Sequence, residues 1–206
     1  MQGKFIVFEG ITGSGKKTHI KLLADRLKAK GRDVVILSFP DYEEEIARLT
    51  KRIDLDPFTQ SLLFAADRAR HQERIRKFLE EGKVILADRY CYSNFAYQSV
   101  KGVPLEWLIE IEKPIIKPDL IILIDVPVEM SVKRVMQSSI EDFTKQEIIS
   151  RLEREKENLE NIRETYLKLA ETDKETRWFV IDGSRDISEN HEEIWKIVAK
   201  EVGVEG

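Results

Sequence analysis

The segment Phe5–Thr18, with the sequence FIVFEGITGSGKKT, constrains the fold of this chain more than any other stretch. An apolar run breaks into a glycine-rich turn, and a lysine and a helical pattern follow directly. A strand, a glycine-rich loop and a helix N-terminus in this order form a cradle for phosphate groups. Backbone N–H groups converge on the phosphate oxygens, and Lys16 adds a full positive charge. A turn that happens to hold three glycines would leave Lys16 unexplained, so the pattern predicts a polyphosphate site.

The size and charge of the chain narrow the possible functions. Its 206 residues are enough for a substantial core, and we predict a single domain over residues 1–206. The 34 basic and 38 acidic residues nearly cancel, which argues against nucleic acid or an acidic membrane surface as a partner. No apolar stretch approaches the roughly 20 residues that span a bilayer. The single cysteine, Cys91, excludes an intrachain disulfide, and we expect a cytoplasmic protein.

Short apolar runs alternate with longer amphipathic segments along the chain, a pattern typical of a parallel sheet covered by helices. The runs are continuous rather than alternating, as expected for strands that are buried on both faces. The predicted strands are 4–9, 34–39, 84–88, 120–125 and 178–182. The predicted helices are 17–30, 56–82, 104–112, 128–136, 145–170 and 186–202. The fold class is therefore α/β, with a short lid predicted around residues 137–150.

A second functional cluster is expected where the predicted strand 84–88 ends. Asp88 and Arg89 stand at this point, and ligands of open α/β sheets bind at the carboxyl edge of the strands. A carboxylate there can hold Mg²⁺ through water or accept a proton, and a guanidinium can bridge phosphoryl oxygens. An ion pair at the end of the strand is the alternative, which the pair alone leaves open.

Six motifs occur in order along essentially the whole chain: FEGITGSGK at 8–16, FPDY at 39–42, LLFAADRARH at 62–71, DRYCYSNFAYQ at 88–98, IDVPVE at 124–129 and IDGSRD at 181–186. Together they resemble the thymidylate kinase family of P-loop nucleoside monophosphate kinases. This resemblance implies a five-stranded parallel sheet flanked by helices and transfer of the ATP γ-phosphoryl group to dTMP. It also implies ATP and Mg²⁺ as cofactors and a homodimer.

The resemblance implies roles for the residues that match the motifs of the family. The nucleotide is expected at Gly10, Ile11, Thr12, Gly13, Ser14, Gly15, Lys16, Lys17, Thr18, Arg134 and Arg185. The substrate is expected at Phe39, Pro40, Phe64, Arg68, Arg89, Ser93, Tyr97 and Gln98. The expected catalytic residues are Lys16, Lys17, Asp88 and Arg89, and Asp88 is expected to hold the metal through water.

Within the substrate group, the likeness implies that Phe64 stacks on the thymine ring and that Arg68 binds a base carbonyl. It implies that Arg89 clamps the acceptor phosphate. It further implies that the ring of Tyr97 lies under the sugar and disfavours a 2′-hydroxyl, and that the amide of Gln98 reads the base. Without the likeness, Phe64 would be interpreted as a core residue and Tyr97 as an ordinary helix residue.

Lys17 departs from the usual phosphate-loop motif, in which a Ser or Thr at this position binds Mg²⁺ through its hydroxyl. A positive charge about 4 Å from a divalent cation repels it by roughly 2 kcal/mol in water and by about 8 kcal/mol at an effective dielectric near 20. Either Lys17 turns toward the γ-phosphate, or the metal shifts onto Asp88 and water. Thr18 cannot substitute, because one residue along a helix turns a side chain by about 100°.

Further departures from the family pattern concern the acceptor and the catalytic charge. Thr12 stands where the family usually has an acidic residue on the sugar 3′-hydroxyl, and Tyr42 stands where many relatives carry an arginine. These changes suggest broader acceptor selectivity. The family also expects a catalytic arginine in the phosphate loop or in the lid, and neither segment supplies one. We hypothesise that Lys17 replaces it, with Arg151 and Arg154 as weaker candidates.

Two other functions remain open at the level of sequence. One is a nucleotide-binding protein with weak turnover, for which Lys17 is the best argument. The other is a kinase for a different nucleoside or nucleoside monophosphate. The presence of Lys16, Asp88 and Arg89 favours the enzyme, because a pure binding protein has no physical need for them.

Overall fold

The computed structural model describes residues 3–52, 54–137 and 156–204. The predicted lid around 137–150 lies outside the described residues except for Gln137. The candidates Arg151 and Arg154 and the first part of the predicted helix 145–170 also lie outside them.

In this part of the chain, five strands form one parallel sheet in the order β2-β3-β1-β4-β5. Their bounds are β1 Lys4–Glu9, β2 Val34–Ser38, β3 Val84–Asp88, β4 Leu120–Asp125 and β5 Arg177–Asp182. The predicted five-stranded parallel sheet is confirmed, with β2 one residue shorter and β5 one residue longer than expected. All of β3 is buried, which explains why its sequence is a continuous apolar run.

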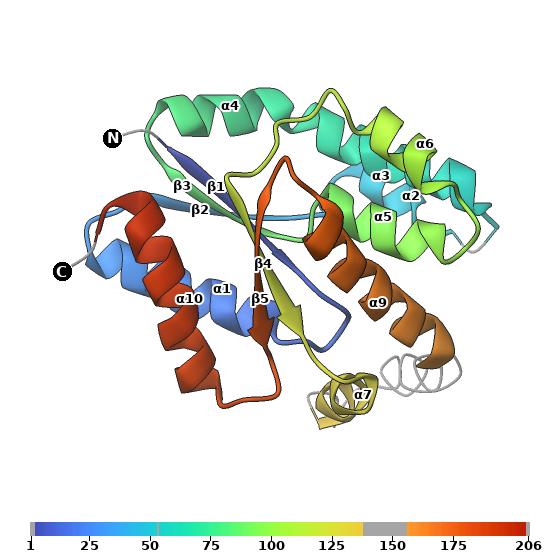
Figure 1. Cartoon of the computed structure of the whole chain (residues 1–206). Coiled ribbons are helices and arrows are strands. Elements are labelled where there is room, and N and C mark those ends of the chain that lie inside the picture. The colour runs from blue at the N-terminus through green and yellow to red at the C-terminus, as the bar shows by residue number, and fades with distance from the viewer. Residues whose placement is uncertain (1–2, 53, 138–155, 205–206) are drawn as a thin grey trace.

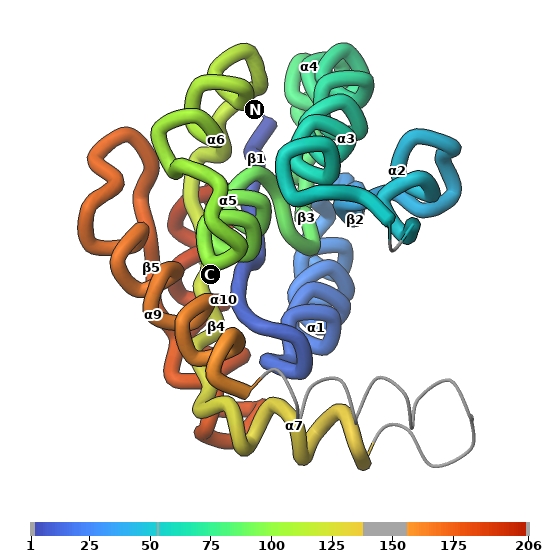
Figure 2. Tube along the Cα trace, turned by 90° about the vertical axis from the view of Figure 1, so that its right-hand side faces the viewer, coloured from blue at the N-terminus to red at the C-terminus, as the bar shows by residue number. Residues whose placement is uncertain are grey.

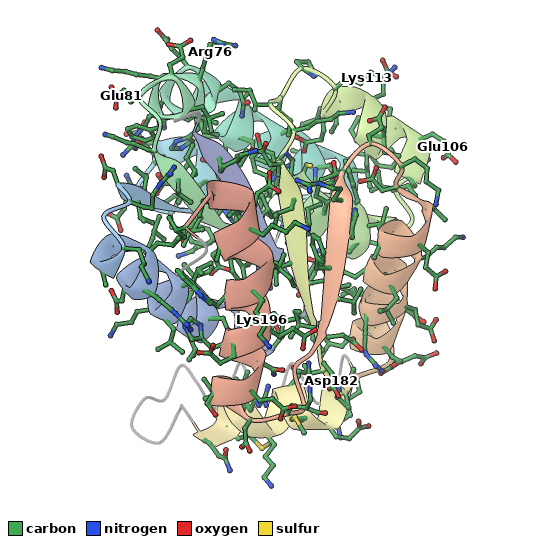
Figure 3. All side chains as sticks on the ribbon, turned by 60° about the vertical axis from the view of Figure 1, so that its left-hand side comes forward. Arg76, Glu81, Glu106, Lys113, Asp182 and Lys196 are labelled. Carbon is green, nitrogen blue, oxygen red and sulfur yellow. The ribbon has the colours of Figure 1, made fainter. Side chains whose placement is uncertain are left out.

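Helices cover both faces of the sheet (Figure 1). Their bounds are α1 Lys16–Ala29, α2 Glu45–Leu49, α3 Pro57–Arg70, α4 Gln72–Glu80, α5 Cys91–Ser99, α6 Leu105–Ile111, α7 Val128–Gln137, α9 Lys156–Thr172 and α10 Ile187–Val202. On one face α1 packs against β2 and β3, beside α10 on β5, whereas α4, α5 and α9 lie on the other. Charged side chains such as Arg76 and Lys196 point away from this layered core (Figure 3).

The predicted single helix over 56–82 is wrong, because the chain turns at His71 into two helices, α3 and α4. Asp56 caps α3 as expected, accepting hydrogen bonds from the N–H groups of Phe58 and Thr59. The turn lets α4 bury Ile75 while the imidazole of His71 packs edge-on against Phe39, with ring centres 5.3 Å apart. The short helix α2 is also not predicted by the sequence pattern.

The carboxyl edge of the sheet gathers the loops that follow β1, β2, β3 and β5. The loop from β1 to α1 lies against α7 (Figure 2), so closely that a Cβ at Gly13 would come within 2.6 Å of the Ser131 carbonyl oxygen. A Cβ at Gly10 would likewise lie 2.5 Å from the Ile124 carbonyl oxygen. Only glycine fits at these two positions, which explains the glycine-rich sequence. Among the described helices, none combines the length and apolar character needed to cross a bilayer.

Candidate active site

A large cleft of about 970 Å³ opens at this carboxyl edge, beside the loop between β1 and α1. The predicted nucleotide and catalytic residues that line it are Thr12, Gly13, Ser14, Gly15, Lys16, Lys17, Thr18, Asp88, Arg89, Arg134 and Arg185. Gly10 and Ile11, the first two residues of this loop, are not among the lining residues; their carbonyl oxygens accept hydrogen bonds from Lys16. Helix α1 begins in this cleft without a side-chain cap, so its first N–H groups remain available to an anion.

Lys16, the first residue of α1, is buried against the loop between β1 and α1. Its ammonium group donates to the carbonyl oxygens of Gly10 and Ile11, both at 2.9 Å, and to the Ser14 hydroxyl at 3.3 Å. Burial and, second to it, the charge of Arg89 lower the pKa of Lys16 to about 7, and the charge of Asp88 opposes this shift. The loop therefore holds an ammonium group that is ready to exchange these contacts for phosphate oxygens.

Asp88 presents a carboxylate to the same cleft. Its side chain is buried, and its Oδ1 has no hydrogen-bond partner within the described residues. An unpartnered carboxylate oxygen beside a phosphate loop fits a divalent cation, because Mg²⁺ usually binds one or two carboxylates together with phosphate oxygens and water. The described ranges contain no cluster of three acidic, His or Cys side chains that could hold a metal without a nucleotide.

Lys17 and Thr18 are exposed in the first turn of α1, and Lys17 forms no ion pair within 3–52, 54–137 and 156–204. Arg134 donates to the carbonyl oxygens of Ser14 at 3.4 Å and Gly183 at 2.8 Å, and so ties the phosphate loop to the loop after β5. Arg185 instead forms ion pairs with Glu189 and Glu193 on α10.

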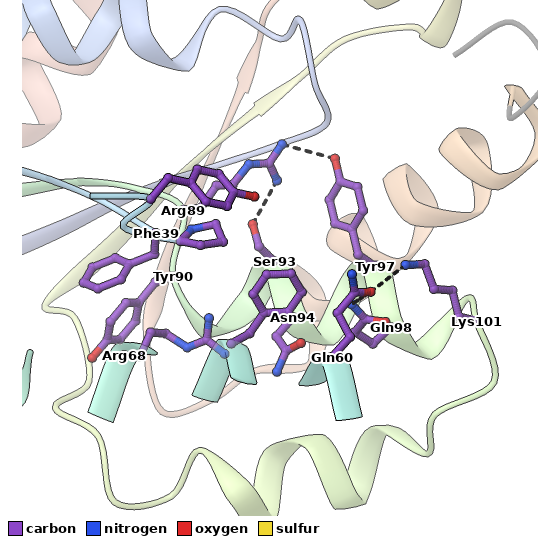
Figure 4. A pocket seen from close by; sticks show the side chains of 13 residues that line it. Phe39, Gln60, Arg68, Arg89, Tyr90, Ser93, Asn94, Tyr97, Gln98 and Lys101 are labelled. Carbon is purple, nitrogen blue, oxygen red and sulfur yellow. Dashed lines mark hydrogen bonds between the residues drawn. The ribbon is translucent and has the colours of Figure 1, made fainter. Parts of the chain in front are cut away.

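A smaller pocket of about 200 Å³ adjoins the cleft (Figure 4). All predicted substrate residues line it: Phe39, Pro40, Phe64, Arg68, Arg89, Ser93, Tyr97 and Gln98. Phe39, Pro40, Tyr42 and Arg89 line both the pocket and the cleft. The side chain of Arg89 therefore stands where the two spaces meet.

The guanidinium of Arg89 donates hydrogen bonds only to hydroxyl groups in the part of the chain that the structure describes. Its Nη1 donates to Ser93 at 3.0 Å and Tyr166 at 3.4 Å, and its Nη2 donates to Tyr97 at 3.2 Å and Thr12 at 3.5 Å. Its backbone has φ = 68°, an uncommon conformation for a residue other than glycine. Because its direct partners are neutral, the guanidinium keeps its positive charge for an anion.

Arg68 enters the opposite side of the pocket from α3 (Figure 4) and is paired with a carboxylate. Its Nε donates to Glu112 at 3.0 Å and its Nη2 donates to the other oxygen of the same carboxylate. Both side chains are almost fully buried, and Glu112 raises the pKa of Arg68 against the lowering effect of burial. Asn94 also donates to Glu112, at 3.1 Å. This wall of the pocket is therefore close to electrically neutral.

The far wall ends in a row of amides. Gln98 donates from Nε2 to Oε1 of Gln60 at 3.0 Å, and Lys101 donates to the same oxygen at 3.0 Å. Gln60 in turn donates to the carbonyl oxygen of Thr50 at 3.1 Å. These contacts fix which atom of the Gln98 amide is its oxygen, and that oxygen is buried with no hydrogen-bond partner among the described residues.

Sequence reasoning misses four residues that hold this site together: Glu9, Gln60, Glu112 and Tyr166. Glu9 lies inside the phosphate-loop motif, but no local pattern indicates its partners. Tyr166 falls in the predicted helix 145–170 and is buried on α9, but nothing local indicates that its hydroxyl contacts Arg89. Glu112 follows α6, where a charged residue usually faces solvent.

The chain is similar to known proteins over nearly all of its length. A sequence model described as "Thymidylate kinase" matches residues 8–194. A "Probable thymidylate kinase" of Pyrococcus horikoshii is 39% identical over 98% of this chain and 98% of its own length. A "Probable thymidylate kinase" of Thermococcus onnurineus is 38% identical over 96% and 98%, and a "Probable thymidylate kinase 1" of Saccharolobus solfataricus is 37% identical over 96% and 97%. With these matches and this site geometry, the chain belongs to the thymidylate kinase family.

Proposed function

We propose that this chain transfers the γ-phosphoryl group of ATP to dTMP, with ATP phosphates in the cleft and dTMP in the adjoining pocket. The observation that carries the proposal is that Arg89 lines both spaces. A phosphoryl transition state needs positioned oxygens and positive charge more than covalent chemistry. Lys16 and Arg89 supply that charge from the two sides of the transferred group.

The substrate roles follow from the chemistry of the pocket walls. The Arg89 guanidinium binds the acceptor phosphate, and Phe64 stacks on the base. Arg68 keeps its Nη1 free of Glu112, so that nitrogen donates to a base carbonyl. The unpartnered oxygen of Gln98 accepts from the base N–H, a donor that thymine has and cytosine lacks at the same ring position.

Asp88 would hold Mg²⁺ through water, and the bound ion would neutralise charge on the phosphate oxygens. Because Lys17 occupies the usual position of the metal-binding hydroxyl, we propose that its ammonium group contacts the γ-phosphate and replaces the missing catalytic arginine. Its exposed position in the cleft supports this role. The variant Lys17→Ser should then lose activity at saturating Mg²⁺. An increase in activity would show that Lys17 only obstructs the metal.

Acceptor selectivity is proposed to be broader than the family norm. Thr12 offers a hydroxyl, not a carboxylate, at the junction with Arg89, and Tyr42 stacks under the ammonium group of Lys51 at 4.0 Å. Neither residue adds a charge for the sugar or phosphate of dTMP. Initial rates with dTMP, dUMP, dGMP and thymidine, measured side by side, test this selectivity.

A homodimer of single-domain chains in the cytoplasm is proposed as the working form. Phe58 and Leu62 on α3 are exposed, and the ring of Phe58 contacts Trp107 at 5.3 Å between ring centres. Such an apolar patch suits burial against a second copy of the chain. Sedimentation velocity should show a dimer for the unmodified chain and a monomer for Leu62→Glu. A monomeric unmodified chain would refute the proposal.

The central experiment is a coupled assay of ADP release with and without dTMP. ADP production that depends on dTMP supports the kinase and excludes an inert nucleotide-binding protein. ADP production with another nucleotide but not with dTMP would favour a kinase for that acceptor.

A further inference from the structure

The carboxylate of Glu9, at the end of β1, lies fully buried directly behind the acceptor pocket. Its Oε1 accepts hydrogen bonds from the backbone N–H groups of Tyr90 at 2.8 Å and Ser93 at 3.2 Å. Its Oε2 accepts from the hydroxyls of Ser93 at 2.7 Å and Tyr166 at 2.9 Å. Each oxygen therefore has a separate task, one toward the backbone and one toward hydroxyl groups.

The first oxygen caps a helix that carries four of the residues lining the pocket. Helix α5 begins after Tyr90 without any cap from its own sequence, and it holds Ser93, Tyr97 and Gln98. Glu9 supplies the missing acceptor from another strand, at the helix end where negative charge is favoured. The residue next to the phosphate loop thus fixes the start of α5.

The second oxygen sets the direction of two hydroxyl groups. An ionised carboxylate only accepts hydrogen bonds, so Ser93 and Tyr166 both turn their hydrogens toward Oε2. Their oxygens lie 2.8 Å apart, and both face Nη1 of Arg89 with their lone pairs. The negative charge of Glu9 therefore acts on Arg89 through two neutral hydroxyl groups. The guanidinium of Arg89 forms no direct ion pair with this carboxylate.

We propose that Glu9 is a positioning residue for the acceptor phosphate: its carboxylate orients Ser93 and Tyr166 so that they hold Arg89 toward the pocket. This inference rests on the proposed function, because it requires the phosphate of dTMP to lie at Arg89. It predicts that Glu9 affects binding of the phosphate group and has little effect on binding of the base and sugar.

The test compares the affinities of dTMP and thymidine, measured by calorimetry without ATP, in the unmodified protein and in Glu9→Gln. The amide keeps an oxygen for the two backbone donors, so the cap on α5 survives. Its NH₂ group replaces Oε2 and donates to the two hydroxyl oxygens, in competition with Arg89. We expect the affinity for dTMP to fall at least about tenfold, as for one charge-assisted hydrogen bond, and that for thymidine to change less than about twofold.

The variant Tyr166→Phe removes one hydroxyl and leaves the carboxylate of Glu9 in place. It should lower the affinity for dTMP several-fold and, as in Glu9→Gln, leave the affinity for thymidine almost unchanged. Glu201→Gln serves as the matched control, because Glu201 pairs with Lys4 and Arg177 at the opposite edge of the sheet. It should leave both affinities unchanged.

Equal losses for dTMP and thymidine in Glu9→Gln, or no loss in either variant, would overturn the role of Glu9 and leave the proposed function intact. Failure of the unmodified protein to bind dTMP would overturn both. If Glu9→Gln does not fold, the ratio measured for Tyr166→Phe decides the question by itself.

Discussion

Two arginines face each other across the acceptor pocket, and they are held in opposite ways. The guanidinium of Arg89 donates hydrogen bonds only to hydroxyl groups within the described residues, whereas Arg68 forms a bidentate pair with the buried Glu112. The first arrangement keeps a net positive charge at the phosphate end of the pocket. The second cancels the charge and leaves a directed N–H donor at the base end. The same side chain therefore serves an anion or a neutral ring according to what stands behind it.

This difference accounts for a pocket that can hold a nucleotide in one orientation. A second unpaired arginine would offer the acceptor phosphate a competing site at the base end. Since Glu112 cancels that charge, Arg68 does not compete with Arg89 for the phosphate. The neutral wall also avoids leaving an ionised guanidinium buried without a partner, which would be costly.

The largest expected effect is that of removing the charge at the phosphate end. Arg89→Met should lower kcat/KM for dTMP by about 10²–10³, the range seen when one donor to a developing charge is lost. Thymidine affinity should change little, because the base end remains intact. Arg89→Lys should recover only part of the activity, since an ammonium group cannot bind two oxygens in a fork. Steady-state kinetics measure kcat/KM for dTMP, and calorimetry measures the affinity for thymidine. A parallel loss of thymidine binding would refute the idea that the phosphate and the base are bound at separate ends of the pocket.

Removing the charge behind Arg68 tests the other end. Glu112→Gln should lower the affinities for dTMP and thymidine by the same factor, because it disturbs the wall of the pocket that contacts the base of both ligands. It should also lower the free energy of unfolding by roughly 3–5 kcal/mol, since a buried arginine loses its partner. Calorimetry and urea denaturation give the two values. A loss confined to dTMP would mean that Arg68 also serves the phosphate.

The charge of Lys16 at the phosphate loop should depend on pH, whereas the charge of Arg68 should not. Lys16 has a pKa of about 7 in the empty protein, and bound phosphate oxygens will raise it. Binding of ATP should therefore take up about one proton at pH 8 and only about a tenth of a proton at pH 6. Calorimetry in buffers of different ionisation enthalpy measures this uptake. In Lys16→Arg, the arginine stays protonated at both pH values, so the difference in proton uptake between pH 8 and pH 6 should vanish.

The smallest effect is expected at the amide row of the base end. Gln60→Ala removes the acceptor that orients Gln98, so the Gln98 amide can turn and present either atom. We expect a loss of about two- to fivefold in kcat/KM for dTMP, about the size of one neutral hydrogen bond, and weaker discrimination against dCMP. An unchanged ratio of rates with the two acceptors would show that Gln98 is oriented without Gln60.

The sequence predicts the elements whose signals are local and misses the contacts that join distant segments. The apolar runs of β3 and β4 identify buried strands, and Gly13 and Lys16 identify the phosphate loop, because each signal lies within a few residues. The bond between Tyr166 and Glu9 joins positions 157 residues apart, and no periodic pattern can reveal it. The pairing of Arg68 with Glu112 is hidden for the same reason. The break at His71 is also set by tertiary contacts, since the helical pattern continues through it.

The hydrogen bonds of Lys16 have a consequence for how the first ligand arrives. All three of its donor hydrogens are directed at the surrounding turn, so the turn keeps its curvature with nothing bound. This turn needs little further ordering when a nucleotide binds, so little binding free energy is lost to the conformational entropy of the loop. The turn between β1 and α1 is therefore preorganised for phosphate binding.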